Sequence, residues 1–445
     1  MNLLSHTAAQ LIELLRKKSI SAEELTRFYL QRIEKYDGAG GLNTIAQINE
    51  QALRQARKID NTPLGERGAL LGLPLLVKDN IDVSAMHTTA GSAALADNPA
   101  KKDAPIIANL KRNGALVLGK TNMTEFANYM AQDMPNGFSS HGGQVINAYD
   151  HEKDSGGSST GSAVAVSAEL CAAAIGTDTS FSVVGCATEN GVTGYKPPHG
   201  TLSAKGIIPI AHSLDSAGTL TQNLEDALLI YNAMRDTPLP NIKPIKPSEL
   251  RLAVNTFNSD QVSEGQMAAY ETLLKAFVHG GGKPATEISH PYTPHQRNIM
   301  RCEFRHDLEK YLQHSTAKRK TLAAIMEFYD ANPAQAPHGV SILHDVLHNT
   351  SGRMDDAEYL LAMRERDTLR AALSAELCHF DAVLMTGPTN MMHFVGFPSV
   401  ALKLGTNSSG HPRGMILYGA DETRLLSAAL TLEQYCDTVP RPNLP

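Results

Sequence analysis

A chain of 445 residues is long enough for two or three ordinary domains, or for one large domain with a big core. Hydrophobic residues make up 42% of it and charged residues 19%, which is the balance of a soluble globular protein. The formal net charge of -6 at pH 7 gives no reason to expect nucleic acid or an anionic membrane as a partner. No apolar run reaches the roughly 18 residues that a membrane-spanning helix needs.

The cysteines and the first residues predict a cytoplasmic protein. The segment MNLLSHTAAQLIELLRKK lacks the basic start, apolar run and cleavage site of a signal peptide. No CxxC or Cys/His cluster has the spacing of a structural zinc site. An odd number of widely scattered cysteines argues against a disulfide framework and for a reducing compartment. The five are Cys171, Cys186, Cys302, Cys378 and Cys436.

Three helices are predicted in the first 60 residues. Thr7 can cap the first helix, and Ser21 with Glu24 forms an S-x-x-E capping box for a second helix that ends near residue 36. Apolar residues of the second helix recur at helical spacing, so we expect one of its faces to be buried. A third helix is predicted over residues 49–58.

Strands and helices alternate along the rest of the chain. Such alternation is typical of an α/β core with a largely covered sheet. The predicted elements are buried strands in 68–82 and 115–122 with a helix at 105–112 between them, a linker or long excursion at 237–248, a strand at 251–257, a helix at 266–278, strongly helical sequence at 301–330, a loop-rich segment at 331–352, buried strands in 381–390 and 397–404, and a last helix at 422–436.

The segment DSGGSSTGSAVAVSAELCAAAIGTDTSFS (154–182) is the most informative part of the sequence. It opens with a turn rich in glycine and serine, continues through an Ala/Val-rich, helix-like stretch and ends on a second serine in a polar turn. Small residues let backbone approach backbone or ligand closely. A flexible linker would lack the apolar middle. Two serine-bearing turns at the ends of one packed segment therefore indicate a catalytic centre.

Three residues carry the candidate chemistry, although each has an ordinary structural interpretation. Lys78 follows the apolar run LPLLV, and burying an ammonium costs several kcal/mol unless it is paired or neutral; a strand-end lysine can instead reach water with its head. Ser158 can cap the helix that follows it. Ser182 alone would be an ordinary turn serine. Only the combination of the three points to catalysis.

That combination resembles the amidase signature family. Its pattern G-G-S-S-[GST]-G-S is matched by residues 156–162, and G-T-[DE]-T-x-[GD]-S is matched in 176–182 except directly before the serine. The two serines are 24 positions apart, as is typical of the family, and G-[LM]-P-x-x-[VL]-K-[DE] is matched by 72–79. The segments 139–150 and 303–312 are most similar to the peptide-amidase-like branch, and the A subunit of glutamine amidotransferases is a poorer match. Further matches lie at 119–128, 194–227 and 414–434.

The resemblance implies a role for each residue, without metal or cofactor. Ser182 would be the nucleophile, Ser158 a bridging serine after a cis peptide bond and Lys78 the general base, while Ser159 and Asp178 orient the network. A serine hydroxyl needs an adjacent base near neutrality. Lysine can serve only when neutral, so its pKa must fall from about 10.4 toward 7 or 8, which burial can achieve. The implied reaction is hydrolysis of a small linear carboxamide through an acyl-enzyme.

One departure from the family pattern concerns the expected oxyanion hole, formed by backbone N–H groups of Thr179, Ser180, Phe181 and Ser182. The family has Gly, or Asp-Gly, directly before the nucleophile, whereas this chain has Ser180-Phe181. A positive φ at residue 181 would strain phenylalanine by roughly 1–3 kcal/mol. Three interpretations stay open: a lineage variant or altered specificity, an acyltransferase with an amine as acceptor, and an impaired amidase that acts as a binding protein.

Other residues are weaker candidates for the site. The loop His141, Gly142, Gly143 and Gln144 could line the substrate pocket, although a plain glycine turn is equally compatible with the sequence. Met130 could also line it, although methionines more commonly fill the core. The same holds for Met134, Met391 and Met392. Cys186 lies near the nucleophile, but a small core residue is the better interpretation. HDVLH (344–348) mimics the HExxH zinc motif, with no obvious third ligand at the usual distance, so we interpret it as accidental.

The resemblance covers nearly the whole chain and implies one α/β domain (1–445), a mixed, twisted central sheet with helices on both faces. Residues 1–60 are expected to wrap around it as helices and could form a homodimer interface. Residues 61–236 would form the catalytic core, and residues 249–445 the rest of the sheet and the substrate-pocket loops.

Overall fold

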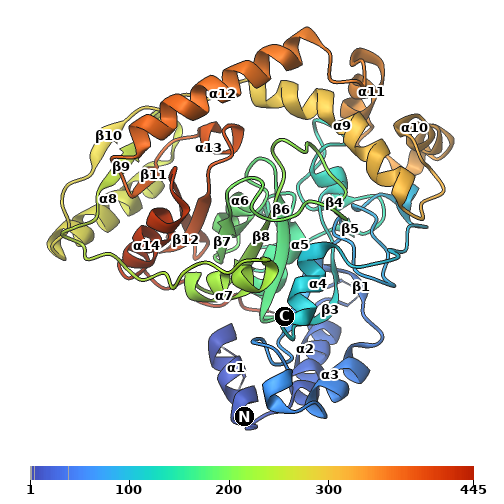
Figure 1. Cartoon of the computed structure of the whole chain (residues 1–445), viewed down its shortest axis with the longest axis horizontal. Coiled ribbons are helices and arrows are strands. Elements are labelled where there is room, and N and C mark those ends of the chain that lie inside the picture. The colour runs from blue at the N-terminus through green and yellow to red at the C-terminus, as the bar shows by residue number, and fades with distance from the viewer. Residues whose placement is uncertain (1–2, 5, 39, 445) are drawn as a thin grey trace.

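The computed structural model describes residues 3–4, 6–38 and 40–444, and these residues are built around one 11-stranded sheet (Figure 1). The strand order is β1-β3-β2-β6-β8-β7-β12-β13-β11-β9-β10. The strands are β1 (Ile45–Ile48), β2 (Pro74–Lys78), β3 (Leu116–Thr121), β6 (Ala173–Asp178), β7 (Thr193–Lys196), β8 (Ser216–Thr221), β9 (Leu252–Asn255), β10 (Thr286–Ile288), β11 (Ala382–Met385), β12 (Ser399–Thr406) and β13 (Pro412–Tyr418), with a separate hairpin of β4 (Phe138–Ser139) and β5 (Gly143–Gln144).

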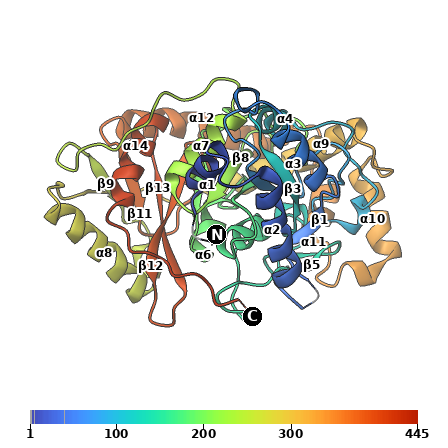
Figure 2. The ribbon, with the colours of Figure 1, turned by 90° about the horizontal axis from the view of Figure 1, so that it is seen from below.

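The sheet is mixed, as predicted. Strand β2 is parallel to β3 and β6, and β9 is parallel to β10 and β11. The other pairs are antiparallel. Helices α9 and α12 run across the top of the view in Figure 1, and α1, α2 and α3 lie at the bottom, so helices cover the sheet from both sides. Figure 2, a view from below, shows α1, α2 and α3 near the middle of the picture, with α7 and α4 beside them.

The helices begin and end close to the residues that the sequence predicts. Capping boxes at Thr7 and Ser21 start the first two helices. The helices are α1 (Ala8–Arg16), α2 (Ala22–Tyr36), α3 (Ala52–Asp60), α4 (Pro105–Arg112), α5 (Thr160–Ser167), α6 (Val184–Glu189), α7 (Leu224–Met234), α8 (Glu264–His279), α9 (His295–His314), α10 (Leu322–Ala331), α11 (Ser341–Asn349), α12 (Ala357–Leu377), α13 (Met391–Phe394) and α14 (Glu422–Glu433). No described helix has the length and apolar character needed to cross a membrane.

Three segments differ from the prediction. The helix-like middle of 154–182 divides into helix α5 and strand β6, because an Ala/Val-rich run suits either element and only its place in the sheet decides. The segment predicted to be loop-rich contains helix α11, which buries Leu343 and Val346. The N-terminal region also contributes a strand, β1, which pairs antiparallel with β3 at the edge of the sheet.

The sheet brings the candidate site residues together at the carboxyl ends of two neighbouring inner strands. Strands β2 and β6 are parallel neighbours, with Val77 opposite Ile175, so both carboxyl ends lie on the same side. Lys78 ends β2 and Asp178 ends β6. Helix α5 is buried along its whole length and starts two residues after Ser158. Residues far apart in the sequence therefore meet where two strands end and a helix begins.

Candidate active site

Lys78, Ser158 and Ser182 form a continuous chain of hydrogen-bonding atoms. The Lys78 Nζ lies 2.8 Å from the Ser158 Oγ, and the Ser158 Oγ lies 3.1 Å from the Ser182 Oγ. Lys78 and Ser158 are fully buried, and Ser182 is 6% exposed. The structure thus places together the three residues that the sequence predicts for the site. The arrangement can carry a proton from one serine through the other to the lysine.

The environment of Lys78 favours its neutral form. Burial lowers the pKa of Lys78 to about 7, against smaller opposing effects of nearby acidic groups. Besides Ser158, its Nζ contacts the Ser159 Oγ at 2.9 Å and the Thr177 Oγ1 and carbonyl oxygen at 2.9 and 3.2 Å. These partners hold the amine in one position, whichever protonation state it has. The strand-end lysine does not extend its head to water.

Ser158 and Ser159 directly precede α5. The peptide bond between Gly157 and Ser158 is cis, as the resemblance implies. The Ser159 Oγ donates to the Thr177 carbonyl oxygen at 3.0 Å, so Ser159 lies within the network as expected. A Cβ at Gly176 would come within 2.7 Å of the Ser159 Oγ, and only glycine allows this approach.

The turn before Ser182 has the backbone shape that glycine would adopt. Phe181 has φ of 67°, in the left-handed region that bulky residues rarely occupy. Its ring is partly buried and packs edge-on against the His393 ring, with centroids 4.3 Å apart. Within the described part of the chain, the N–H groups of Ser180, Phe181 and Ser182 have no hydrogen-bond acceptor. These three donors can therefore serve an anionic oxygen at the turn.

The Asp178 carboxylate binds the backbone directly after Ser182. Its Oδ2 accepts hydrogen bonds from the N–H groups of Val183 and Val184 at 2.7 and 3.3 Å. Its Oδ1 lies 3.2 Å from the Nδ1 of His393, which is fully buried. Burial alone would raise the pKa of Asp178, but His393, Lys196 and the Val183 N–H lower it to about 2. Burial lowers the pKa of His393, against the opposing effect of the Asp178 charge.

The residues that hold Thr179 were not predicted from the sequence. The Thr179 Oγ1 donates to the Asp215 Oδ1 at 2.6 Å, and the Thr179 carbonyl oxygen accepts from the Gln296 Nε2 at 3.0 Å. Asp215 lies in the segment 194–227 that matches the family, and its acidic side chain among apolar residues was the available signal. Gln296 and His393 come from distant helices, and no local pattern marks them.

Three of the predicted pocket residues, Gly142, Gly143 and Gln144, lie in the hairpin of β4 and β5, and Met130 lies outside it. Their role stays a prediction. Gly142 and Gly143 lie at the turn between β4 and β5, and the Gly142 carbonyl accepts from the Asn43 side chain at 2.7 Å. The Gln144 side chain donates to two backbone carbonyls of its own loop. Met130 is 2% exposed and its carbonyl accepts from the Ile342 N–H at 3.1 Å.

The remaining candidates have structural surroundings. Cys186 is fully buried and burial raises the pKa of its thiol to about 12, which fits a core residue. His344 and His348 share a face of α11, with ring centroids 4.4 Å apart, but Asp345 between them binds the Arg301 guanidinium. All five cysteines are free.

Comparison with known proteins gives the family to which this chain belongs. The amidase family model matches residues 24–395. The A subunit of glutamyl-tRNA(Gln) amidotransferase from Legionella pneumophila is 31% identical over 422 residues, which cover 90% of this chain and 84% of that protein. The chain belongs to the amidase family and is an enzyme that acts on amides.

Solved structures of relatives have the same fold. An amidase family protein from Bacillus anthracis str. Ames aligns with a TM-score of 0.91 and 29% identity, over 99% of this chain and 93% of that one. Native peptide amidase from Stenotrophomonas maltophilia aligns with a TM-score of 0.91 and 28% identity, over 100% and 99% of the two chains. The predicted fold class and family are confirmed.

Proposed function

We propose that the protein hydrolyses a linear carboxamide through an acyl-enzyme on Ser182, with Ser158 as relay and Lys78 as base. The observation that carries this proposal is the unbroken contact from the Ser182 Oγ through the Ser158 Oγ to the Lys78 Nζ, at 3.1 and 2.8 Å. The similarity to peptide amidase supports the hydrolytic reaction.

In the acylation step the Ser182 Oγ attacks the amide carbon, and a C–O bond forms. The hydroxyl proton moves to the Ser158 Oγ while the Ser158 proton moves to the neutral Lys78 amine. The tetrahedral intermediate then collapses, the C–N bond breaks, and the same route returns a proton to the leaving amine. A lysine with a pKa near 7 suits both directions, because it accepts and releases a proton with little cost.

In the deacylation step water takes the place of the amine. Lys78, neutral again, accepts a proton from water through Ser158, and the resulting hydroxide attacks the ester carbon. The ester C–O bond breaks, the carboxylic acid leaves and Ser182 recovers its proton. In both steps the negative oxygen would lie against the N–H groups of Ser180, Phe181 and Ser182. Donors already in place stabilise the developing charge without reorganising.

A fluorophosphonate probe tests the nucleophile without knowledge of the substrate. We expect the wild-type protein to be labelled and the Ser182→Ala variant, folded to the same extent, to stay unlabelled. The matched control is Ser180→Ala, in the same turn, which should keep most of the labelling. Equal labelling of wild type and Ser182→Ala would place the nucleophile elsewhere. A folded wild-type protein that does not react with the probe would favour the interpretation that the chain is an impaired amidase that acts as a binding protein.

Product analysis distinguishes hydrolysis from transfer. A small amide library is first screened for amides that the probe-reactive protein consumes. These amides are then incubated with the protein, with and without hydroxylamine. Hydrolysis predicts carboxylic acid as the main product in buffer. Preferential formation of the hydroxamate or of an amide from an added amine, at amine concentrations far below that of water, would favour the acyltransferase.

A further inference from the structure

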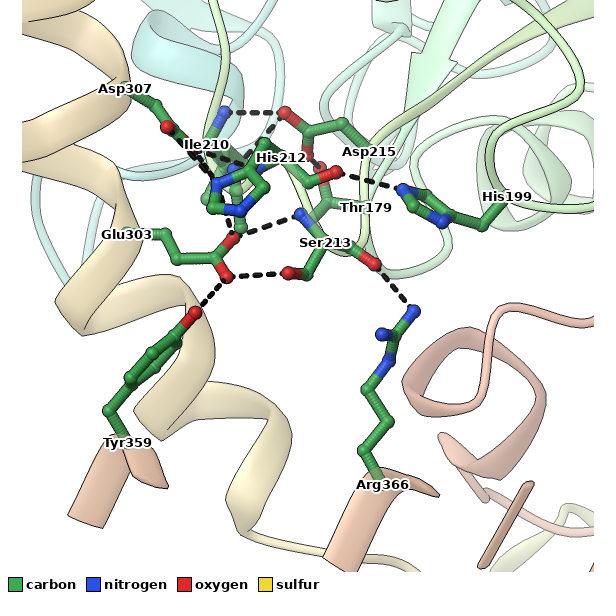
Figure 3. Close-up of polar contacts among 11 residues, drawn as sticks. Thr179, His199, Ile210, His212, Ser213, Asp215, Glu303, Asp307, Tyr359 and Arg366 are labelled. Carbon is green, nitrogen blue, oxygen red and sulfur yellow. Dashed lines mark hydrogen bonds and ion pairs between the residues drawn. The ribbon is translucent and has the colours of Figure 1, made fainter. Parts of the chain in front are cut away.

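A cluster of charged side chains lies where the segment 210–215 meets helix α9. It is next to the turn of residues 179–182, which is called the oxyanion turn below. His212 projects from this segment between Glu303 and Asp307 of the helix (Figure 3). The two carboxylates are four residues apart on α9 and almost fully buried, with side-chain exposures of 0% and 7%. The His212 side chain is 52% exposed, so it exchanges protons with solvent. The cluster thus joins a titratable group to a buried scaffold.

The segment is fastened to α9 by both backbone and side chains. Asp307 accepts from the His212 N–H at 2.7 Å and lies 2.9 Å from its Nδ1. Glu303 accepts from the Ser213 N–H and Oγ at 2.9 and 2.6 Å, and its Oε2 lies 3.2 Å from the His212 Nδ1. From the other side, Arg366 of α12 donates to the Ser213 carbonyl oxygen at 2.7 Å. Two helices therefore hold the segment.

The other end of the segment reaches the oxyanion turn. Asp215 receives the N–H groups of Ile210 and Ala211 on its Oδ2, at 2.8 and 3.1 Å, and the Thr179 hydroxyl on its Oδ1. Figure 3 shows Asp215 and Thr179 to the right of His212. Thr179 is the residue before Ser180, whose N–H is the first of the free donors. One side-chain hydrogen bond, from Thr179 to Asp215, therefore connects the segment to the turn.

The groups around His212 favour its charged form. The hydrogen bond that the His212 ring makes to the Asp307 carboxylate raises the pKa of His212, and the negative charges of Glu303 and Asp307 add to this against partial burial. The charged and titratable groups that face His212 or its carboxylate partners are Glu303 and Asp307 from α9, Asp215 and His199 from its own connection, and Tyr359 and Arg366 from α12. Burial raises the pKa of Asp215 to about 7.

His212, Glu303 and Asp307 also have the spacing of a cation site, because one ligand atom from each lies within 4.8 Å of the others in the described chain. Protein donors already occupy their oxygens, however. Glu303 accepts from Ser213 and from the Tyr359 hydroxyl, and Asp307 accepts from His212. A hydrogen-bonded clamp satisfies these groups without an ion.

We propose that His212 is a positioning residue for the Thr179 end of the oxyanion turn, and that its imidazolium form holds segment 210–215 more firmly than neutral imidazole does. The inference rests on the proposed function, since it requires an oxyanion at that turn. It gives the enzyme an alkaline limb of activity that Lys78 does not supply. Lys78 gains its active, neutral form as pH rises, whereas His212 loses its charge.

The test uses the rate of fluorophosphonate labelling, because the phosphoryl oxygen would occupy the oxyanion hole. We compare wild type with His212→Asn, whose amide can still donate near the Nδ1 position but does not titrate. We expect the maximal rate constant of His212→Asn to be about two- to fivefold below wild type near neutral pH and equal to it about two pH units higher, with unchanged probe affinity. The control His314→Gln, at the exposed end of α9, should match wild type throughout.

A second variant keeps the inference testable if His212→Asn folds poorly. Asp307→Asn removes one of the charges that favour imidazolium, so it should move the alkaline limb to lower pH without abolishing it. Identical pH profiles for wild type and both variants would overturn the inference. So would loss of labelling in EDTA with recovery in Mn²⁺, because the cluster would then be a cation site. Labelling that survives Ser182→Ala would instead refute the proposed function, whatever the His212 variants do.

Discussion

The Phe181 ring packs edge-on against the His393 ring, with centroids 4.3 Å apart and an interplanar angle of 63°. This contact explains how phenylalanine occupies a position with φ of 67° directly before the nucleophile. A left-handed residue costs about 1–2 kcal/mol, and an aromatic pair of this geometry contributes about 0.5–1.5 kcal/mol beyond the area it buries. The two terms are similar, so the turn keeps the shape it would have with glycine. The sequence departure is therefore compatible with an intact oxyanion hole.

Replacing Phe181 tests that conclusion. Phe181→Gly should change the labelling rate by less than about threefold, because Phe181 already has a φ that glycine adopts readily; loss of one donor would cost about 10²-fold or more. Phe181→Ala loses the ring but keeps a Cβ at positive φ, so it should be about 1 kcal/mol less stable than Phe181→Gly in urea unfolding. A large gain in labelling for Phe181→Gly would show instead that the ring suppresses activity.

Lys78 is expected to be indispensable for acylation. Lys78→Met removes the base while keeping an unbranched side chain of similar length, and labelling should fall by about 10²–10⁴-fold. Lys78→Arg is the sharper comparison, because guanidinium keeps the charge and donors but does not deprotonate in proteins. Both variants should fold, as judged by circular dichroism and thermal unfolding. Wild-type labelling by Lys78→Arg would contradict the role of lysine as base.

How far the sequence predicts this molecule depends on whether the signal is local. The capping boxes at Thr7 and Ser21 and the strand ending at Lys78 are local patterns, and the structure contains them. The motifs around Ser158 and Ser182 carry the site for the same reason. His393, Gln296 and Asp215 reach the turn from α13, α9 and the connection before β8, and only the tertiary fold brings them there. The sequence did not predict where α5 ends and β6 begins, because both elements are fully buried and consist largely of small residues.

The pH dependence of stability should reveal the buried lysine. The pKa of Lys78 is about 7 in the folded protein and about 10.4 in an unfolded chain, so between these values only the unfolded state keeps the proton. Stability relative to Lys78→Met should therefore rise with pH from about 7 to about 10, by up to about 1.4 kcal/mol per pH unit. Urea unfolding of both proteins at two pH values in this window measures the difference. Parallel pH dependence would mean that Lys78 has an ordinary pKa.

Asp178 links the turn to the electrostatics of the relay. Its pKa of about 2 keeps it ionised at all working pH values, so it should add no limb of its own to the pH profile of labelling. Its negative charge acts to raise the pKa of Lys78. Asp178→Asn should therefore move the acid limb of labelling, near pH 7 in wild type, to lower pH. The maximal rate should also fall, by about tenfold, because a charge-assisted hydrogen bond to the Val183 N–H becomes a neutral one. A slower variant with an unmoved acid limb would show that Asp178 supports only the turn.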